Sequence, residues 1–175
     1  MHKVILKKYY FINNFNINNI DKLEKNTIII YRNYKKKKVT NDLIKLKNYC
    51  KVKGIKLYIS NNINLAMKMN VAGAYIPSFN KDFRHLSFKF KKNFKLIGSA
   101  HSIKEIRLKE KQCVKYIFIS SLFKNNKNYL GFNKFNNLKK LTKKKIIALG
   151  GVSKSNLKQV KLLSCSGFGG IRYFE

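Results

Sequence analysis

The sequence predicts an α/β protein of the (βα)8, or TIM-barrel, class. Short apolar runs alternate with segments of helical periodicity, which is the pattern of repeated βα units around a parallel sheet. Eight such runs are present, and eight parallel strands with intervening helices close into a barrel. The 175 residues suffice for one sizeable core and are too few for two ordinary domains. We therefore expect a single domain over residues 1–175.

The expected strands are rich in β-branched and aromatic residues, as buried strands usually are. The second run, Thr27–Tyr31, is mostly isoleucine, and the seventh, Lys145–Leu149, ends at two glycines. The eighth run closes the series near the end of the chain. The strands are expected at residues 9–12, 27–31, 55–59, 74–76, 94–98, 114–119, 145–149 and 167–173.

About seven helices are expected between these strands, several of them with clear end signals. Thr40 is the expected N-cap of the second helix, and Gly54 is expected to stop it. Ser102 and Glu105 have the spacing of a capping box. The segment 80–93 has mixed character. The other helices are expected at residues 20–25, 40–52, 64–69, 132–141 and from Ser153 or Ser155 to 164.

The expected barrel is compact. At 175 residues it is smaller than the typical TIM barrel of about 250 residues. The sequence ends two residues after Tyr173, so the usual eighth helix is expected to be missing. An open, doubly wound sheet is the structural alternative, and it would require edge strands and a topological switch point.

The chain is strongly basic, with 39 Lys and Arg residues against 7 Asp and Glu residues and a formal net charge of +32. Such an excess attracts nucleic acid, anionic lipid or phosphorylated metabolites. Lys, Asn, Ile, Tyr and Phe, which have AT-rich codons, dominate the chain, so a compositional bias is the alternative explanation. The lysines are spread along the chain apart from the short runs 35–38 and 143–145, which disfavours nucleic-acid binding.

The cysteines indicate a cytoplasmic protein. Cys50, Cys113 and Cys165 are widely spaced and form no CxxC pair, so we expect buried, reduced thiols and no metal site. The first residues contain no apolar segment of the kind found in signal peptides, and no apolar run approaches the roughly 20 residues of a membrane span. The oligomeric state is left open.

Gly150 and Gly151 form the firmest local feature, a predicted phosphate-binding turn. Without a Cβ, backbone can approach a phosphate closely, and a following helix points free N–H groups at it. In barrels, phosphate commonly lies between the loops after strands seven and eight. A tight strand-to-helix turn without a ligand is the alternative. Arg172, after the eighth strand, is a further possible phosphate contact.

Several strand ends, taken in order, resemble the thiamine-phosphate synthase/TenI family. The resemblance covers nearly the whole chain. It rests on the order and spacing of the matching segments rather than on any one motif. It implies an enzyme that condenses hydroxymethylpyrimidine pyrophosphate with thiazole phosphate and releases pyrophosphate, or one that isomerises a carboxythiazole phosphate. The segments concerned are Ile59–Ala66, Val71–Ile76, Ile97–Ser102, Tyr116–Phe123 and Ile147–Val152.

The resemblance also implies roles for individual residues. Arg32 and Lys127 correspond to cations that bind pyrophosphate, and Gly151 corresponds to the phosphate-site glycine. Ser99 corresponds to the family serine on strand five, and His101 resembles an acid/base residue. Each has a structural alternative: Arg32 and Lys127 as ordinary surface cations, and His101 as a helix-start residue.

The family's magnesium ligands are replaced. Where the family has an Asn-Asp pair after the third strand the chain has Ser60-Asn61, and Asn80 stands for the aspartate after the fourth. Mg²⁺ is expected from the family, but it requires anionic oxygen ligands, and Asp82 lies at a poor offset. Tyr34 replaces a family lysine, with Lys35 next to it.

We therefore expect a thiamine-biosynthesis transferase of reduced activity. The alternatives are a TenI-like tautomerase that needs no metal, with His101 as the acid/base residue, and a non-catalytic barrel. Such a barrel would bind a phosphorylated ligand or nucleic acid, and steep salt dependence would identify the nucleic-acid case.

Overall fold

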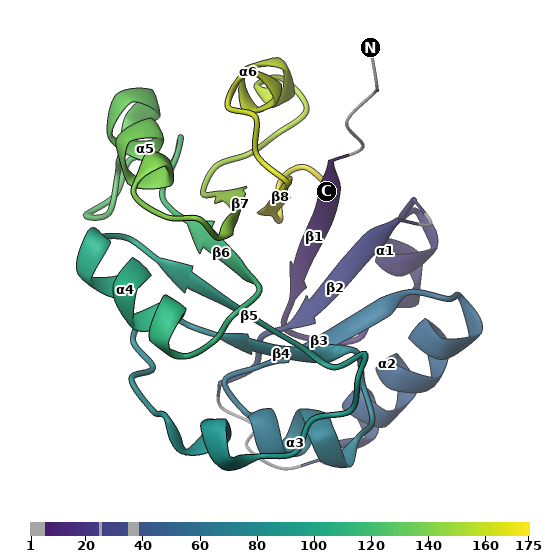
Figure 1. Ribbon diagram of the computed structural model, residues 1–175. Helices are drawn as coiled ribbons and strands as arrows, with labels where there is room; N and C mark the ends of the chain where they lie inside the picture. Colours follow the sequence, from purple (N-terminus) through teal and green to yellow (C-terminus); the bar gives the residue numbers. More distant parts are fainter. Residues whose placement is uncertain (1–5, 25, 35–38) are drawn as a thin grey trace.

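The computed structural model describes residues 6–24, 26–34 and 39–175. Within them, eight parallel strands form a closed barrel in chain order, and β1 pairs with both β2 and β8 (Figure 1). This closure confirms the predicted (βα)8 class and excludes the open sheet. The strands are β1 (Lys7–Ile12), β2 (Thr27–Tyr31), β3 (Lys56–Ser60), β4 (Gly73–Ile76), β5 (Lys95–Ala100), β6 (Tyr116–Ile119), β7 (Lys145–Leu149) and β8 (Gly167–Gly170).

The helices lie outside the barrel, between successive strands (Figure 1). Segment 80–93, which lacks a clear sequence pattern, contains only the 3₁₀ turn η1 (Arg84–Ser87). The six α-helices in the described residues are α1 (Ile17–Asp21), α2 (Asn41–Val52), α3 (Ile63–Lys68), α4 (Ile103–Lys111), α5 (Gly131–Lys140) and α6 (Leu157–Leu162).

Local capping explains where the helices begin. The predicted cap of α2 is confirmed, because Thr40 Oγ1 accepts a hydrogen bond from Leu43 N at 3.3 Å. The prediction for the first helix was wrong by three residues, because Asn16 caps α1 through Asn19 N. α6 also begins later than expected. Asn156 Oδ1 accepts from Ser153 N, so residues 154–156 form a turn before the helix.

The end of the chain differs from the prediction. β8 stops at Gly170, and residues 171–174 form a turn closed by a hydrogen bond from Phe174 N to the Ile171 carbonyl. The Tyr173 ring packs on Phe168 at 4.6 Å between centroids, and the Phe174 ring packs on Tyr10 at 4.8 Å. These rings cover part of the outer face of β8 and β1, where a final helix packs in larger barrels.

The barrel interior is filled by aromatic and branched side chains, so it is a packed core rather than a pore. Phe118 lies at its centre, with ring centroids 4.9 Å from Tyr9, 5.5 Å from Tyr75 and 6.0 Å from Phe11. The inner cluster consists of Tyr9, Phe11, Ile30, Tyr58, Tyr75, Ile97, Tyr116, Phe118 and Ile147. A second cluster packs the outer strand faces against the helices.

The thiols follow the expectation in part. Cys50 and Cys165 are buried, whereas Cys113 is exposed at a residue with φ of +57° after α4. In the described residues all three are free, and no group of three His, Cys, Asp or Glu side chains is arranged to hold a metal. None of the described helices has the length and apolar character needed to cross a lipid bilayer.

Candidate functional site

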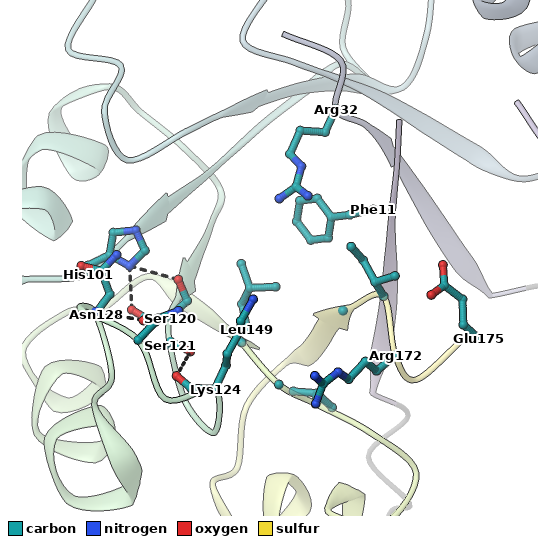
Figure 2. Close-up of a pocket in the computed structure, with 16 residues that line it drawn as sticks. Phe11, Arg32, His101, Ser120, Ser121, Lys124, Asn128, Leu149, Arg172 and Glu175 are labelled. Atoms are coloured by element: carbon teal, nitrogen blue, oxygen red, sulfur yellow. Dashed lines mark hydrogen bonds between the residues drawn. The ribbon is translucent and has the colours of Figure 1, made fainter. Parts of the chain in front are cut away.

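A cavity of about 450 Å³ opens at the carboxyl ends of the strands, the end where TIM-barrel enzymes place their sites. Figure 2 shows that its wall is assembled from loops far apart in sequence. Each of these loops follows a different strand, so closure of the barrel is what brings them together. The wall is formed by Phe11, Arg32, His101, Ser120, Ser121, Lys124, Asn126, Asn128, Leu149, Gly150, Gly151, Val152, Gly170, Ile171, Arg172 and Glu175.

The glycine turn joins two of these loops. Gly150 and Gly151 have φ values of +100° and +77°, a region that favours glycine. The Gly150 carbonyl accepts hydrogen bonds from Phe123 N at 2.8 Å and Lys124 N at 3.3 Å. The turn therefore holds the β6–α5 loop against the end of β7. Its structural role is plain, and both glycines also line the cavity, as a phosphate-binding turn would.

The short helix after the glycine turn contributes no residue to the cavity wall. α6 begins only at Leu157, and its N-cap residue is used locally. Asn156 Nδ2 donates to the Gly151 carbonyl at 2.9 Å, while its Oδ1 accepts from Ser153 N. Any phosphate contact here would therefore come from the turn itself and from neighbouring cations.

Arg32 follows β2 and lines the cavity. Its backbone N donates to the Ile12 carbonyl at 2.7 Å, which fixes the first residue after β2 against the end of β1. The guanidinium lies over the Phe11 ring, with Cζ 5.4 Å from the centroid, and points into the cavity (Figure 2). This cation–π contact orients the charge, while its hydrogen-bond donors remain suited to bidentate binding of an oxyanion.

His101 follows β5 and is fixed on two sides. Its backbone N donates to Glu105 Oε2 at 2.6 Å, and Ser102 Oγ accepts from Glu105 N at 3.3 Å. The predicted pair of Ser102 and Glu105 is thus present. The Glu105 carboxylate, however, binds the backbone N of His101 rather than that of the N-cap residue Ser102. Nδ1 lies 2.7 Å from the Ser120 carbonyl (Figure 2). A carbonyl oxygen can only accept, so Nδ1 carries the proton and Nε2 is the basic atom of the neutral ring.

Ser99 and Lys127 lie outside the cavity wall. Ser99 is buried on β5, where its hydroxyl bonds with Tyr75, and burial raises the pKa of the Tyr75 hydroxyl. Lys127 is exposed on the β6–α5 loop. Lys124, three residues earlier on the same loop, lines the cavity instead. Lys124 is also the first basic residue after β6 in the sequence. This position could have indicated it as a candidate, whereas the family resemblance pointed to Lys127.

Two charged residues near the end of the chain complete the site. Arg172, which the sequence suggested only as a possible phosphate contact, lines the cavity beyond β8. Glu175 also lines it, and Glu175 Oε1 accepts a 3.4 Å hydrogen bond from the Tyr10 hydroxyl. Three cations, Arg32, Lys124 and Arg172, thus share one wall with a single carboxylate, an arrangement suited to an anionic ligand.

The residues at the positions of the family's metal ligands do not fit Mg²⁺. Asn80 Nδ2 donates to Asn61 Oδ1 at 2.7 Å, so the two amides bind one another. Asp82 forms a 2.5 Å ion pair with Arg84, whose hydrogen bonds lower the pKa of that carboxyl to about 2. This carboxylate is therefore ionised and already paired with a guanidinium group. Magnesium prefers anionic oxygen ligands in octahedral geometry, which this cluster does not offer.

The comparisons with known proteins agree with this architecture. A family model described as "Thiamine monophosphate synthase" matches residues 19–173. A thiamine-phosphate synthase of Persephonella marina is 25% identical over 150 residues, which cover 79% of this chain and 69% of that protein.

Solved structures share the fold at low sequence identity. A thiamine phosphate pyrophosphorylase from Pyrococcus furiosus superposes with a TM-score of 0.76 at 16% identity, covering 95% of this chain and 85% of that one. A thiamine phosphate pyrophosphorylase from Bacteroides thetaiotaomicron superposes with a TM-score of 0.60 at 15% identity, covering 97% of this chain and 84% of that one. FabK from Thermotoga maritima superposes with a TM-score of 0.71 at 12% identity, covering 97% of this chain and 59% of that one. At such low identities the structural likeness shows the barrel fold alone.

Proposed function

Because the chain belongs to the thiamine monophosphate synthase family, we propose that it condenses hydroxymethylpyrimidine pyrophosphate with thiazole phosphate and releases pyrophosphate. The observation that supports this most directly is the cavity at the carboxyl ends of the strands. It combines Arg32, Lys124 and Arg172 with the Gly150-Gly151 turn, and both substrates and the leaving group are polyanions. A thiamine-pathway role rests on the family, whereas the reaction itself is our proposal.

The residues of the cavity suit a dissociative reaction. The bond between the pyrimidine methylene and pyrophosphate breaks, and the thiazole nitrogen attacks the resulting cation. Arg32 would neutralise the departing pyrophosphate, and the glycine turn would position the thiazole phosphate, with Lys124 and Arg172 beside it. The protein thus contributes charge neutralisation and orientation, and no proton transfer is needed to form the new bond.

We further propose that this chain works without resident Mg²⁺ and at a reduced rate. Mg²⁺ neutralises pyrophosphate in the family, and the Asn61–Asn80 pair offers no anionic ligand for it. The remaining cations can compensate only in part, because a divalent ion bound to the leaving group stabilises its charge more strongly than a side chain in water.

The test is pyrophosphate release by the purified protein, with both substrates present and Mg²⁺ added or omitted. We expect slow turnover that Mg²⁺ raises little, and a further loss in Arg32→Gln. The double variant Asn61→Asp/Asn80→Asp is expected to gain stimulation by Mg²⁺. Full synthase rates in the wild type that depend on Mg²⁺ would reject the metal-free proposal, and no condensation under any condition would reject the synthase reaction.

His101 supports a second candidate, isomerisation of a carboxythiazole phosphate. The Ser120 carbonyl holds the Nδ1 proton, so Nε2 is available as a base in a cavity that binds phosphate. If this is the reaction, His101→Ala abolishes isomerisation of that substrate and leaves its binding intact. Retained isomerisation in the variant would remove this candidate.

A further inference from the structure

A second cavity, of about 400 Å³, opens at the opposite end of the barrel. Its wall comes from the starts of strands and the turns before them, so it is separate from the candidate site at the strands' carboxyl ends. We call it the amino-end cavity. It is lined by Leu6, Lys7, Tyr9, Asn26, Thr27, Ile28, Gly54, Lys56, Tyr58, Lys95 and Tyr116.

The three lysines of the amino-end cavity occupy equivalent places in the barrel. Lys7, Lys56 and Lys95 are the first residues of β1, β3 and β5. Each lies two residues before a member of the inner cluster, so its side chain starts on the inner face of the sheet. Alternate strands contribute the side chains of one interior layer. Lysines thus occupy the bottom layer, which is normally filled by Val, Ile or Leu.

The charges of this layer are close enough to affect one another. Burial and the neighbouring Lys115 and Lys56 lower the pKa of the Lys95 ammonium group. Lys7 Nζ hydrogen-bonds to the Tyr116 hydroxyl and lies 4.3 Å from the centroid of that ring. Although burial opposes the change, this hydrogen bond and the nearby lysines lower the pKa of Tyr116. The cavity is therefore a region of concentrated positive potential.

The amino-end cavity holds no carboxylate to balance these charges. All seven Asp and Glu residues of the chain fall in its described part, and none of them lines this cavity. The cations of this cavity are therefore not balanced by any carboxylate in its wall.

We propose that the amino-end cavity binds a small multivalent oxyanion of the class of pyrophosphate and phosphate esters. Three ammonium groups on one layer can surround such an anion, and the tyrosine hydroxyls of Tyr58 and Tyr116 add neutral donors. The volume of about 400 Å³ matches a small molecule better than a polymer. This binding is independent of the proposed reaction at the other end of the barrel.

The test measures calorimetric binding of pyrophosphate at fixed ionic strength, with phenyl phosphate and glycerol phosphate as second probes. The wild type, Lys56→Gln/Lys95→Gln and the charge-matched control Lys45→Gln/Lys51→Gln, whose lysines are exposed on α2, are compared. All three are repeated in an Arg32→Gln background, which weakens the carboxyl-end site. In that background, a loss of binding that the Lys56/Lys95 substitutions cause and the control substitutions do not is assigned to the amino-end cavity.

In the Arg32→Gln background we expect pyrophosphate to bind, and the Lys56/Lys95 substitutions to weaken it about tenfold or more, as loss of charge-assisted hydrogen bonds does. The control pair is expected to change the affinity little. If phenyl phosphate binds more tightly than glycerol phosphate, the site is assigned to aromatic phosphate esters. If the two bind equally, the phosphate group alone is recognised.

Equal affinity in the Lys56/Lys95 variant and the control would overturn the proposal, as would an oligonucleotide that binds this face far more tightly than pyrophosphate. Removing mutually repelling charges should not unfold the barrel, so the variant's melting temperature without ligand is expected to equal or exceed that of the wild type. If the double variant fails to fold, the single variant Lys56→Gln, at an exposed residue, is compared with Lys45→Gln in the same assay.

Discussion

Gly150 is held in a conformation and a space that alanine cannot share, so Gly150→Ala is expected to destabilise the barrel strongly. Its φ of +100° lies outside the regions that L-residues adopt readily. A Cβ built on Gly150 lies 2.4 Å from Ser121 Oγ and 2.7 Å from Ser121 Cα. Ser121 cannot easily move, because its N donates to the Asn128 carbonyl and its carbonyl accepts from Leu130 N, each at 2.9 Å.

Two costs add in this variant. The left-handed conformation costs a residue with a Cβ about 1–2 kcal/mol. Overpacking against a fixed neighbour costs typically another ~1–3 kcal/mol. The free energy of unfolding is therefore expected to fall by about 3 kcal/mol, which for a chain of this size lowers the melting temperature by roughly 6–12 °C.

Gly54→Ala is the matched control. Gly54 has a φ of +67°, and a Cβ there meets no atom within 4 Å, so only the conformational cost applies. We expect Gly54→Ala to lower the free energy of unfolding by about 1 kcal/mol and the melting temperature by roughly 2–4 °C. Urea and thermal unfolding of the two variants measure the difference. Equal losses at Gly150 and Gly54 would show that the contact with Ser121 carries no cost, and would refute the close-packing account of the turn.

Further predictions concern titration, thiol reactivity and binding. Burial lowers the pKa of the Lys109 ammonium group to about 8, so the unfolded chain holds that proton more tightly. Raising the pH from about 8 to 10.5 should then increase the free energy of unfolding by up to ~3 kcal/mol, a rise that urea titrations should find missing in Lys109→Met. Burial raises the pKa of Cys50 to about 12 and of Cys165 to about 11, while Cys113 is exposed; a thiol reagent at pH 8 should label Cys113 alone until the protein unfolds. Arg32→Gln should weaken thiazole phosphate and pyrophosphate binding at the carboxyl-end site by roughly 10- to 100-fold with little change in melting temperature, and a large fall in that temperature would instead assign Arg32 a structural role.

The fold was largely predictable from the sequence because each strand is a short apolar run between polar segments. The capping signals at Thr40 and Ser102 also act locally, over three residues, so their effect could be predicted without the structure. The first helix and β8 were misplaced for a different reason. Asn16 was not recognised as a cap, and Tyr173 belongs to a turn whose ring packs back on the barrel.

The site was less predictable, because its members meet only through barrel closure. The resemblance implied Arg32, His101 and the glycine turn, and these share one cavity. The resemblance also pointed to Lys127, whereas Lys124 lines the cavity wall. The position of a residue in a sequence alignment does not determine which way its side chain faces in a loop. The hydrogen bond between Asn61 and Asn80 could not be predicted, because it joins loops nineteen residues apart in the sequence.

The distribution of charge in the barrel bears on why the chain is so basic. A compositional bias would account for many of the lysines, but it would not account for the places where no carboxylate balances them. Glu24, Asp82 and Glu110 are engaged in ion pairs, and none of them lines either cavity. One end of the barrel therefore gathers Arg32, Lys124 and Arg172 against a single carboxylate, and the other gathers three lysines against none. Whatever the origin of the excess cations, closure of the barrel brings part of them together at its two ends, and we propose that a phosphate is stabilised at each.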